Sequence, residues 1–162
     1  MVDGPRRTDA LDAILAGLLS SHTGIEAAAV VSYDGLPIAS ALPASMEESR
    51  VAAMSAALLS LGERATEGLG RGALSEVFID GDLGTVCLVS CDDEAVLVAV
   101  AEKGAKIGLV RYEVRHCAGD VAGVLRRPEA LPVLPAQSSA PLPWSTYAPA
   151  GTVLPGEPAG WS

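Results

Sequence analysis

Residues 74–101 read LSEVFIDGDLGTVCLVSCDDEAVLVAVA, and this stretch determines the fold class of the chain. It contains three runs rich in β-branched residues, 74–80, 85–91 and 95–101, separated by the short turns GDLG and DDE. Connections of this length join neighbouring antiparallel strands. The stretch therefore predicts a three-stranded antiparallel meander.

A helix and a hairpin are expected at the start of the chain. Leucine and isoleucine recur at helical spacing after Thr8, which is a favourable N-cap residue, and Gly24 ends the pattern. The runs 25–33 and 36–42 then flank Asp34-Gly35, which is a typical turn signal between two hairpin strands.

A second helix is predicted between the hairpin and the meander. Ser45 and Glu48 have the spacing of a capping box, which places the start of this helix there and its end near Leu69. The helix has two apolar faces, and one sheet can cover only one of them. We expect the other face to contact a partner through a seam made of Val51, Met54, Leu58, Leu61 and Ala65.

A third helix follows Gly104 and ends with Arg126-Arg127, so the element order is α-β-β-α-β-β-β-α. One folded domain over residues 8–127 accounts for this pattern. Eight of the eleven prolines lie in residues 128–162, which contain no Lys or Arg. This composition predicts a Pro-rich, mostly disordered tail.

The charge balance argues against nucleic-acid binding as the main activity, and we expect no nucleic-acid partner. Twenty acidic and eleven basic side chains give a net charge of −9, and only two of the basic residues are lysines. Three cysteines, an odd number, favour a reducing cytoplasm. No apolar run is long enough to cross a bilayer, so we expect a cytoplasmic protein, with peripheral attachment to a membrane through partners left open.

The residues predict no catalytic, cofactor-binding or metal site. The glycine clusters match neither phosphate-binding fingerprint, and His22 and His116 lack a suitably placed nucleophile. Cys87 and Cys91 share one face of one strand about 13 Å apart, which is too far for a common zinc ion or a disulfide. We expect no enzyme activity, no cofactor and no metal.

Two stretches carry a resemblance to a known family: DGLPIAS at residues 34–40 and GLVRYE at residues 108–113. With the element order, they resemble the Roadblock (dynein light chain) family over about residues 8–127, and most closely its MglB-like, actinobacterial branch. The resemblance implies an α/β (α+β) fold of the profilin-like kind. In it a five-stranded antiparallel sheet forms the middle of a three-layer α/β/α sandwich, with the second helix on one face and the other two helices on the opposite face.

The resemblance also implies a homodimer. In the family, the second helices of two subunits pack together and the third strands pair edge to edge, which removes an exposed sheet edge. The candidate residues of a dimer or partner interface are therefore the helical seam and two positions of the third strand: Val51, Met54, Leu58, Leu61, Ala65, Val77 and Ile79.

The function that the resemblance implies is non-catalytic. Family members bind small Ras-like GTPases and regulate or localise them, so we expect a homodimeric regulator or scaffold of such a GTPase in bacterial signalling, with a membrane-associated signalling complex as a further setting. The alternative is a small-ligand-sensing or protein-interaction module of the same fold without a GTPase partner. A ligand sensor would need a cavity with polar lining groups between sheet and helix.

Overall fold

The structure is a computed structural model, and it describes residues 6–127. The predicted tail, residues 128–162, lies outside the described residues. The elements follow the predicted order: α1 (Arg7–Leu19), β1 (Ile25–Ser32), β2 (Pro37–Ala41), α2 (Glu48–Gly68), β3 (Glu76–Gly81), β4 (Gly84–Cys91), β5 (Ala95–Glu102) and α3 (Ile107–Leu125).

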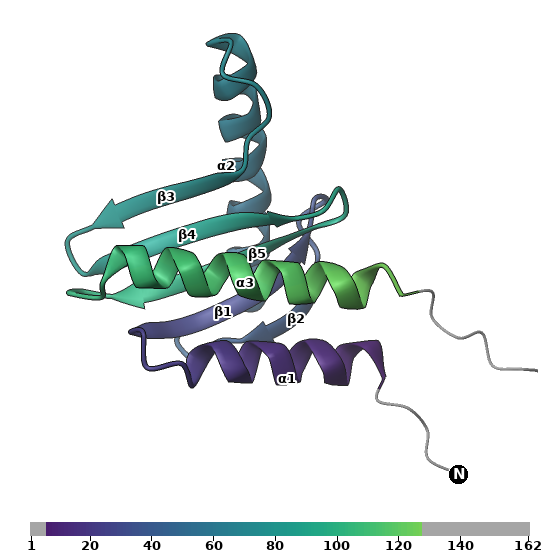
Figure 1. The fold of residues 1–162 in the computed structure, drawn as a ribbon, viewed down its shortest axis with the longest axis vertical. Coiled ribbons are helices and arrows are strands. Elements are labelled where there is room, and N and C mark those ends of the chain that lie inside the picture. Colours follow the sequence, from purple (N-terminus) through teal and green to yellow (C-terminus); the bar gives the residue numbers. More distant parts are fainter. Residues whose placement is uncertain (1–5, 128–162) are drawn as a thin grey trace, which may run out of the picture. The chain divides into compact units, whose positions relative to one another are not determined.

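The strands form one antiparallel sheet in the order β2-β1-β5-β4-β3. Helices α1 and α3 lie side by side on one face, and α2 crosses the other face (Figure 1). The predicted meander is confirmed as β3-β4-β5, and the predicted three-layer sandwich is confirmed as well. Two of the strands, β2 and β3, are edges of the sheet in the described part of the chain.

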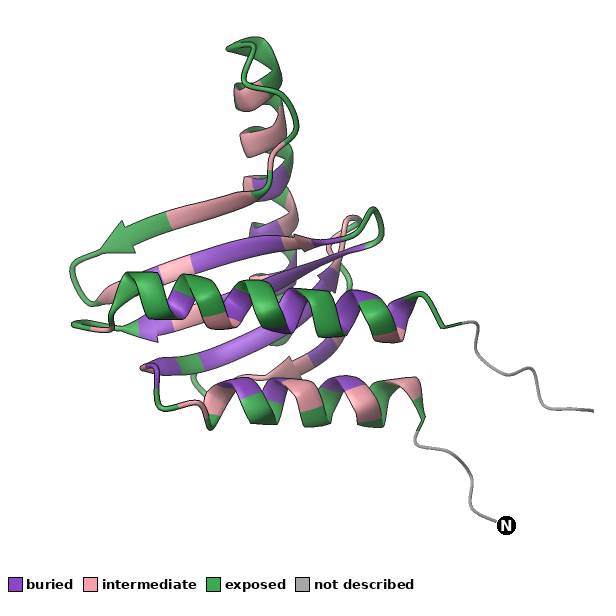
Figure 2. Ribbon diagram, in the orientation of Figure 1, coloured by how far each residue is buried: buried purple, intermediate pink, exposed green. Residues whose placement is uncertain are grey.

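Strand β5 shows why the central strands are almost continuously apolar. Leu97 and Ala99 point into the core beneath α1 and α3, whereas Val96 and Val98 point into a second core beneath α2. A strand covered on both faces has no solvent side, so its sequence does not alternate. Figure 2 shows this burial in the middle strands, in contrast to the exposed far end of α2.

The starts of two helices differ from the sequence-based prediction. Helix α1 begins before Thr8, and the backbone amide of Arg6 donates to the Asp9 carboxylate at 3.1 Å, so the predicted cap by Thr8 is wrong. Helix α2 begins at Glu48, and the predicted capping box with Ser45 does not form. The Glu48 carboxylate instead accepts a hydrogen bond of 2.7 Å from the Ser40 hydroxyl.

Gly84 is the glycine whose replacement should be most costly. Its φ is +156°, and a Cβ atom built there would lie 2.3 Å from the carbonyl oxygen of Ala101. We expect Gly84→Ala to lower the free energy of unfolding by about 1–3 kcal/mol, measured by urea denaturation. Gly119→Ala is the control because nothing lies within 4 Å of that position in α3, and it should be neutral or stabilising by up to about 1 kcal/mol. Similar effects for both variants would contradict this view of the β3–β4 turn.

Candidate interaction surface on the α2 face

Helix α2 covers only part of its face of the sheet. Its buried residues are Ala52, Ser55 and Leu59, which lie on the side of the helix that packs against the strands. Beside this contact an open groove of about 480 Å³ runs between α2 and the sheet. The sheet face is therefore left incompletely covered by the described residues of one chain.

The groove is apolar on both sides. Strands β3, β4 and β5 supply Ile79, Val86, Val98 and Val100, and α2 supplies Val51, Met54 and Leu58. The hydroxyl of Ser55 also lines the groove, but it donates to the carbonyl of Val51 at 2.7 Å. Charged side chains from Glu47 and Arg50 lie at the end where α2 begins. Such a surface buries apolar area well and offers little for orienting a small polar ligand.

The predicted interface residues divide into two groups. Met54, Leu61 and Ala65 are exposed, with 51% and 66% of the surface of Met54 and Leu61 accessible to solvent, and Ile79 is 39% exposed. Val51, Leu58 and Val77 are half-buried and pack against the core beneath α2. The sequence-based prediction assigned the whole helical seam to the face that points away from the sheet. In the structure, Val51 and Leu58 instead lie where the contact of α2 with the sheet meets the groove.

The end of α2 extends beyond the sheet (Figure 1). Gly62 still lies close to the rest of the chain, because a Cβ atom built there would lie 2.9 Å from the Leu74 side chain, whereas nothing lies within 4 Å of the same position at Gly68. Beyond it, Leu69 is 74% exposed. Leu61 in α2 and Leu69 just after it thus present exposed apolar side chains on either side of a more polar, charged last stretch of the helix.

Strand β3 is held firmly at its start and is open along its outer edge. The Glu76 carboxylate pairs with Arg111 and accepts a hydrogen bond of 3.0 Å from Nε of Arg115, and only 8% of the Glu76 side chain is exposed. The Arg111 guanidinium also lies 5.8 Å from the ring centre of Phe78. These contacts join β3 to α3. Among the described residues no strand pairs with the outer edge of β3, so this edge could pair with a strand of another chain.

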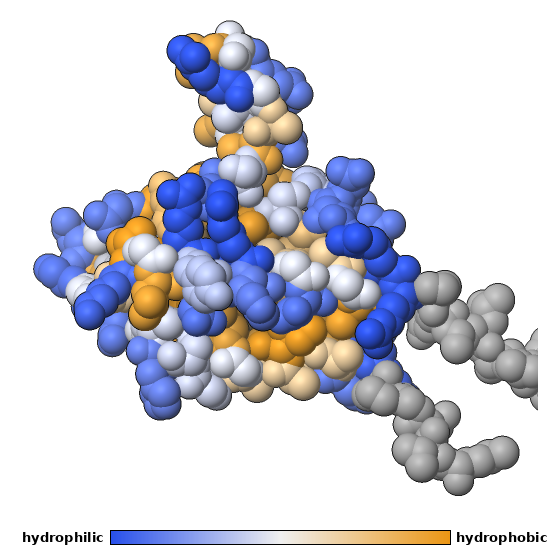
Figure 3. Space-filling view, in the orientation of Figure 1, coloured by the Kyte–Doolittle hydropathy of each residue, from blue (hydrophilic) through white to orange (hydrophobic). Residues whose placement is uncertain are grey.

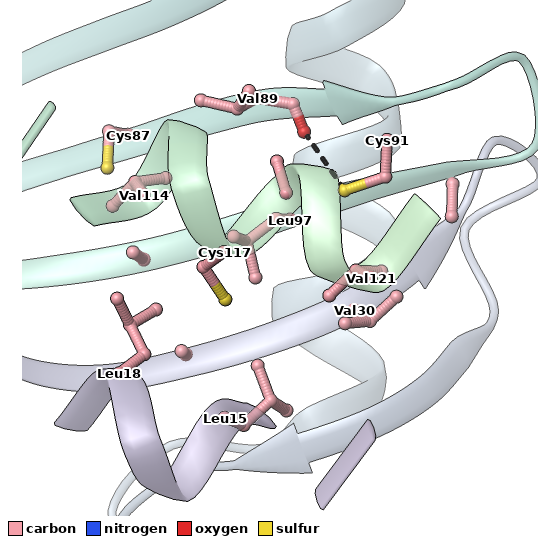
Figure 4. Close-up of a cluster of buried hydrophobic side chains, with 14 of the residues drawn as sticks. Leu15, Leu18, Val30, Cys87, Val89, Cys91, Leu97, Val114, Cys117 and Val121 are labelled. Atoms are coloured by element: carbon pink, nitrogen blue, oxygen red, sulfur yellow. Dashed lines mark hydrogen bonds between the residues drawn. The ribbon is translucent and has the colours of Figure 1, made fainter. Parts of the chain in front are cut away.

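The three cysteines lie in the core between the sheet and α3 (Figure 4). Burial raises the pKa of the Cys87 thiol to about 11 and the pKa values of Cys91 and Cys117 to about 12. A thiol with a raised pKa is a poor nucleophile at neutral pH. The cysteines therefore act as small apolar side chains of the core.

These pKa values predict a pH dependence of stability. The unfolded chain loses its thiol protons near pH 8.5, whereas the folded chain keeps them until about pH 11–12. Because the folded state then binds more protons, the free energy of unfolding should fall as pH rises above about 8.5. We expect the urea concentration at the midpoint of denaturation to decrease as the pH is raised from 8 to 10. A variant with Cys87, Cys91 and Cys117 changed to Ala should lose much of this dependence of the midpoint on pH. An equal dependence of the midpoint on pH in both proteins would show that the three buried thiols are not its cause.

The histidines are not paired with a nucleophile in the described part of the chain. His22 follows α1 with a φ of +55°, and Nδ1 of His116 lies 3.4 Å from the Asp120 carboxylate on the exposed side of α3. Within residues 6–127, no three His, Cys, Asp or Glu side chains gather in a way that would hold a metal ion. None of the helices described is both long and apolar enough to span a bilayer.

Comparison with known proteins shows the family to which the chain belongs. Residues 11–101 match the family model of the Roadblock/LC7 domain. The chain belongs to the Roadblock/LC7 family, which confirms the resemblance seen in the sequence. Two uncharacterised proteins of Methanocaldococcus jannaschii are 33% and 34% identical to it over 103 and 100 residues, which is 64% and 62% of this chain and 90% and 87% of those proteins.

Solved structures show the same fold. Myxococcus xanthus MglB superposes with a TM-score of 0.69 at 16% identity, covering 77% of this chain and 94% of MglB. A Roadblock/LC7 domain from Streptomyces avermitilis superposes with a TM-score of 0.66 at 23% identity, covering 70% of this chain and 96% of that domain. At these identities the likeness concerns the fold.

Proposed function

We propose that the protein is a non-catalytic, homodimeric regulator or scaffold of a small Ras-like GTPase in bacterial signalling. The observation that carries the proposal is the apolar groove beside α2, together with the end of α2 that extends past the sheet. Family membership supports the proposal, and so does the fold shared with MglB.

The homodimer is supported by a groove and a projecting helix that both belong to this face. In a two-fold dimer the same patch is used by both subunits, so a projecting helix on one subunit can fill a groove on the other. Met54 and Leu61 would be buried between the helices, with Val51 and Leu58 beneath them and Ile79 at the strand edge. Pairing of two β3 strands would also satisfy the open edge of the sheet.

The GTPase role rests on the family that the sequence resembles. The resemblance implies a regulator that binds a Ras-like GTPase and repositions the catalytic residues of that GTPase without donating an arginine finger. Such a regulator acts by binding one conformation of the switch loops better than another. The exposed charged residues of α2 and its N-cap would adjust the rate and orientation of docking; they are Glu47, Glu48, Arg50, Arg64 and Glu67.

Nucleotide-dependent binding tests this function. The full chain is mixed with a Ras-like GTPase encoded in the same genome, loaded with either GDP or a non-hydrolysable GTP analogue. Size-exclusion chromatography with light scattering then gives the mass of each complex. A complex of two copies of this chain with the GTPase, formed with one nucleotide at least about tenfold more tightly than with the other, is the expected result. A dimer that binds neither nucleotide form of any such GTPase would overturn the proposed regulatory role. The proposed dimer itself would still stand.

The ligand-sensing alternative would require the same groove to bind a small molecule. A sensor needs polar groups that orient its ligand, and the groove beside α2 is lined mainly by apolar side chains. A thermal-shift screen with metabolites distinguishes the two functions, because a ligand that binds the folded state raises the melting temperature without any GTPase. Stabilisation by a metabolite, with no GTPase binding, would favour the sensor.

A further inference from the structure

A second groove lies on the opposite face of the sheet, between α1 and α3. It has a volume of about 230 Å³, and its base is formed by Ile14 and Leu18 of α1 and Cys117 of α3. Leu18 and Cys117 are buried, and Ile14 is half-buried. Figure 3 shows a hydrophobic band between these two helices on the face that it presents.

The wall of this groove along α1 is made of small residues. Ala13 and Gly17 line it, and nothing lies within 4 Å of the position that a Cβ atom of Gly17 would occupy. Gly17 has an ordinary helical backbone, so its conformation does not require glycine, and a glycine inside a helix is less favourable than alanine. The consequence is a bare stretch of α1 backbone that a partner can approach closely.

The other side of the groove is acidic. Glu113 and Asp120 of α3 line it, seven residues apart, which places them about 10 Å apart along the helix. The arginines of α3 that are closest in sequence, Arg111 and Arg115, are bound by Glu76 on the side facing β3. His116 lies between the two acids, with its Nδ1 3.4 Å from the Asp120 carboxylate.

Helix α1 adds no positive charge to balance these acids. It has no Lys or Arg after Arg7, and Arg7 itself donates to the carbonyl of Leu125 at the end of α3. The next lysine or arginine in the chain is Arg50. The groove therefore combines an apolar base with an acidic rim and carries no lysine or arginine among its lining residues.

We propose that the α1–α3 groove binds a segment of a partner protein that presents an apolar side chain between two basic ones. Lysine or arginine residues two helical turns apart would reach Glu113 and Asp120, and the apolar side chain between them would lie against Ile14 and Leu18. The groove is shallow and smaller than most small-molecule sites, which favours a peptide segment. It lies on the opposite face from the α2 groove, so this docking site is independent of the proposed dimer and GTPase contacts.

A pair of model peptides tests the proposal on the full chain. The first is a fluorescently labelled amphipathic helix of leucine, alanine and lysine with lysines two turns apart, and the second has glutamate in place of every lysine. We expect the lysine peptide to bind with a micromolar dissociation constant in fluorescence anisotropy, and the glutamate peptide to bind at least about tenfold more weakly. Equal binding of both peptides, or of neither, overturns the proposal.

Two variants of α1 locate the binding site. Gly17→Leu adds a side chain to the wall of the groove, at a position where nothing lies within 4 Å of the new Cβ atom, and it should weaken binding of the lysine peptide at least about tenfold. Ala16→Leu adds similar bulk at an exposed position that does not line the groove, and it should leave binding unchanged. Equal affinity of both variants for the peptide would place the site elsewhere. Light scattering should show the same mass for both variants and the original chain, which separates this site from the dimer interface.

Charge variants test the acidic rim. Glu113→Gln combined with Asp120→Asn should weaken binding of the lysine peptide about fivefold at low salt. Asp93→Asn combined with Glu94→Gln makes the same change in net charge in the β4–β5 turn and should have little effect. Glu113→Lys combined with Asp120→Lys should reverse the preference in favour of the glutamate peptide. Equal weakening by both neutral pairs would mean that only the net charge attracts the peptide, and the proposal would fail.

Discussion

Met54→Glu is expected to convert the proposed dimer into monomers. Met54 is half exposed in one chain and lines the groove beside α2, so in the proposed dimer its side chain is buried between two helices. A two-fold interface receives the substitution twice, and each glutamate must lose water among apolar side chains. We expect the dissociation constant of the dimer to rise at least about 100-fold, measured by size-exclusion chromatography with light scattering over a range of concentrations.

Ser60→Glu is the matched control for this experiment. Ser60 is exposed on α2 and does not line the groove, so the same charge there should leave the dimer intact. Met54 is a better site than Leu58 because Leu58 also packs against the core beneath α2, where a glutamate would destabilise the single chain. If Met54→Glu remained dimeric at low concentration, the groove would not be the subunit interface.

Leu97→Ala is expected to produce the largest loss of stability. Leu97 lies in β5, at the centre of the sheet, and none of its surface is accessible to solvent. Removing a buried leucine side chain costs the transfer free energy of the lost atoms and leaves a cavity beneath α1 and α3. The free energy of unfolding should fall by about 2–5 kcal/mol in urea denaturation followed by circular dichroism.

Leu83→Ala provides the comparison for Leu97→Ala. Leu83 is in the turn between β3 and β4 and is 87% exposed, so its truncation should change the free energy of unfolding by less than about 0.5 kcal/mol. A loss at Leu83 as large as the loss at Leu97 would show that the turn is buried in the protein as it exists in solution, as it would be in an assembly.

The sequence predicts the elements well because their signals are local. The hairpin turn at Asp34-Gly35 and the runs that become β4 and β5 are visible without knowledge of neighbours. The capping of α2 could not be predicted in the same way. Glu48 has the spacing for a capping box, but Ser40 in β2 binds its carboxylate, and that contact exists only after the hairpin and helix are brought together.

The candidate site could be predicted only in part. Helical spacing identified Met54 and Leu61 as apolar residues with no sheet to cover them, and both are exposed. The groove beside them depends on how far α2 covers the sheet, which is a property of packing with no local signal. For the same reason the sequence did not indicate that Val51 and Leu58 pack against the sheet as well, nor that Glu113 and Asp120 line a common groove with α1.

The position of β5 between β1 and β4 has a consequence for the order of folding. The meander can form from neighbouring residues, but the pairing of Ala29 with Val98 joins strands from opposite ends of the domain. Closing so long a loop is entropically costly, and chains rich in such contacts fold slowly. On the ribosome, the N-terminal hairpin would have to wait, with one edge of β1 unpaired, until β5 had left the exit tunnel. The centre of the sheet therefore forms late in synthesis, and α3, which follows β5 in the chain, can cover it only after that.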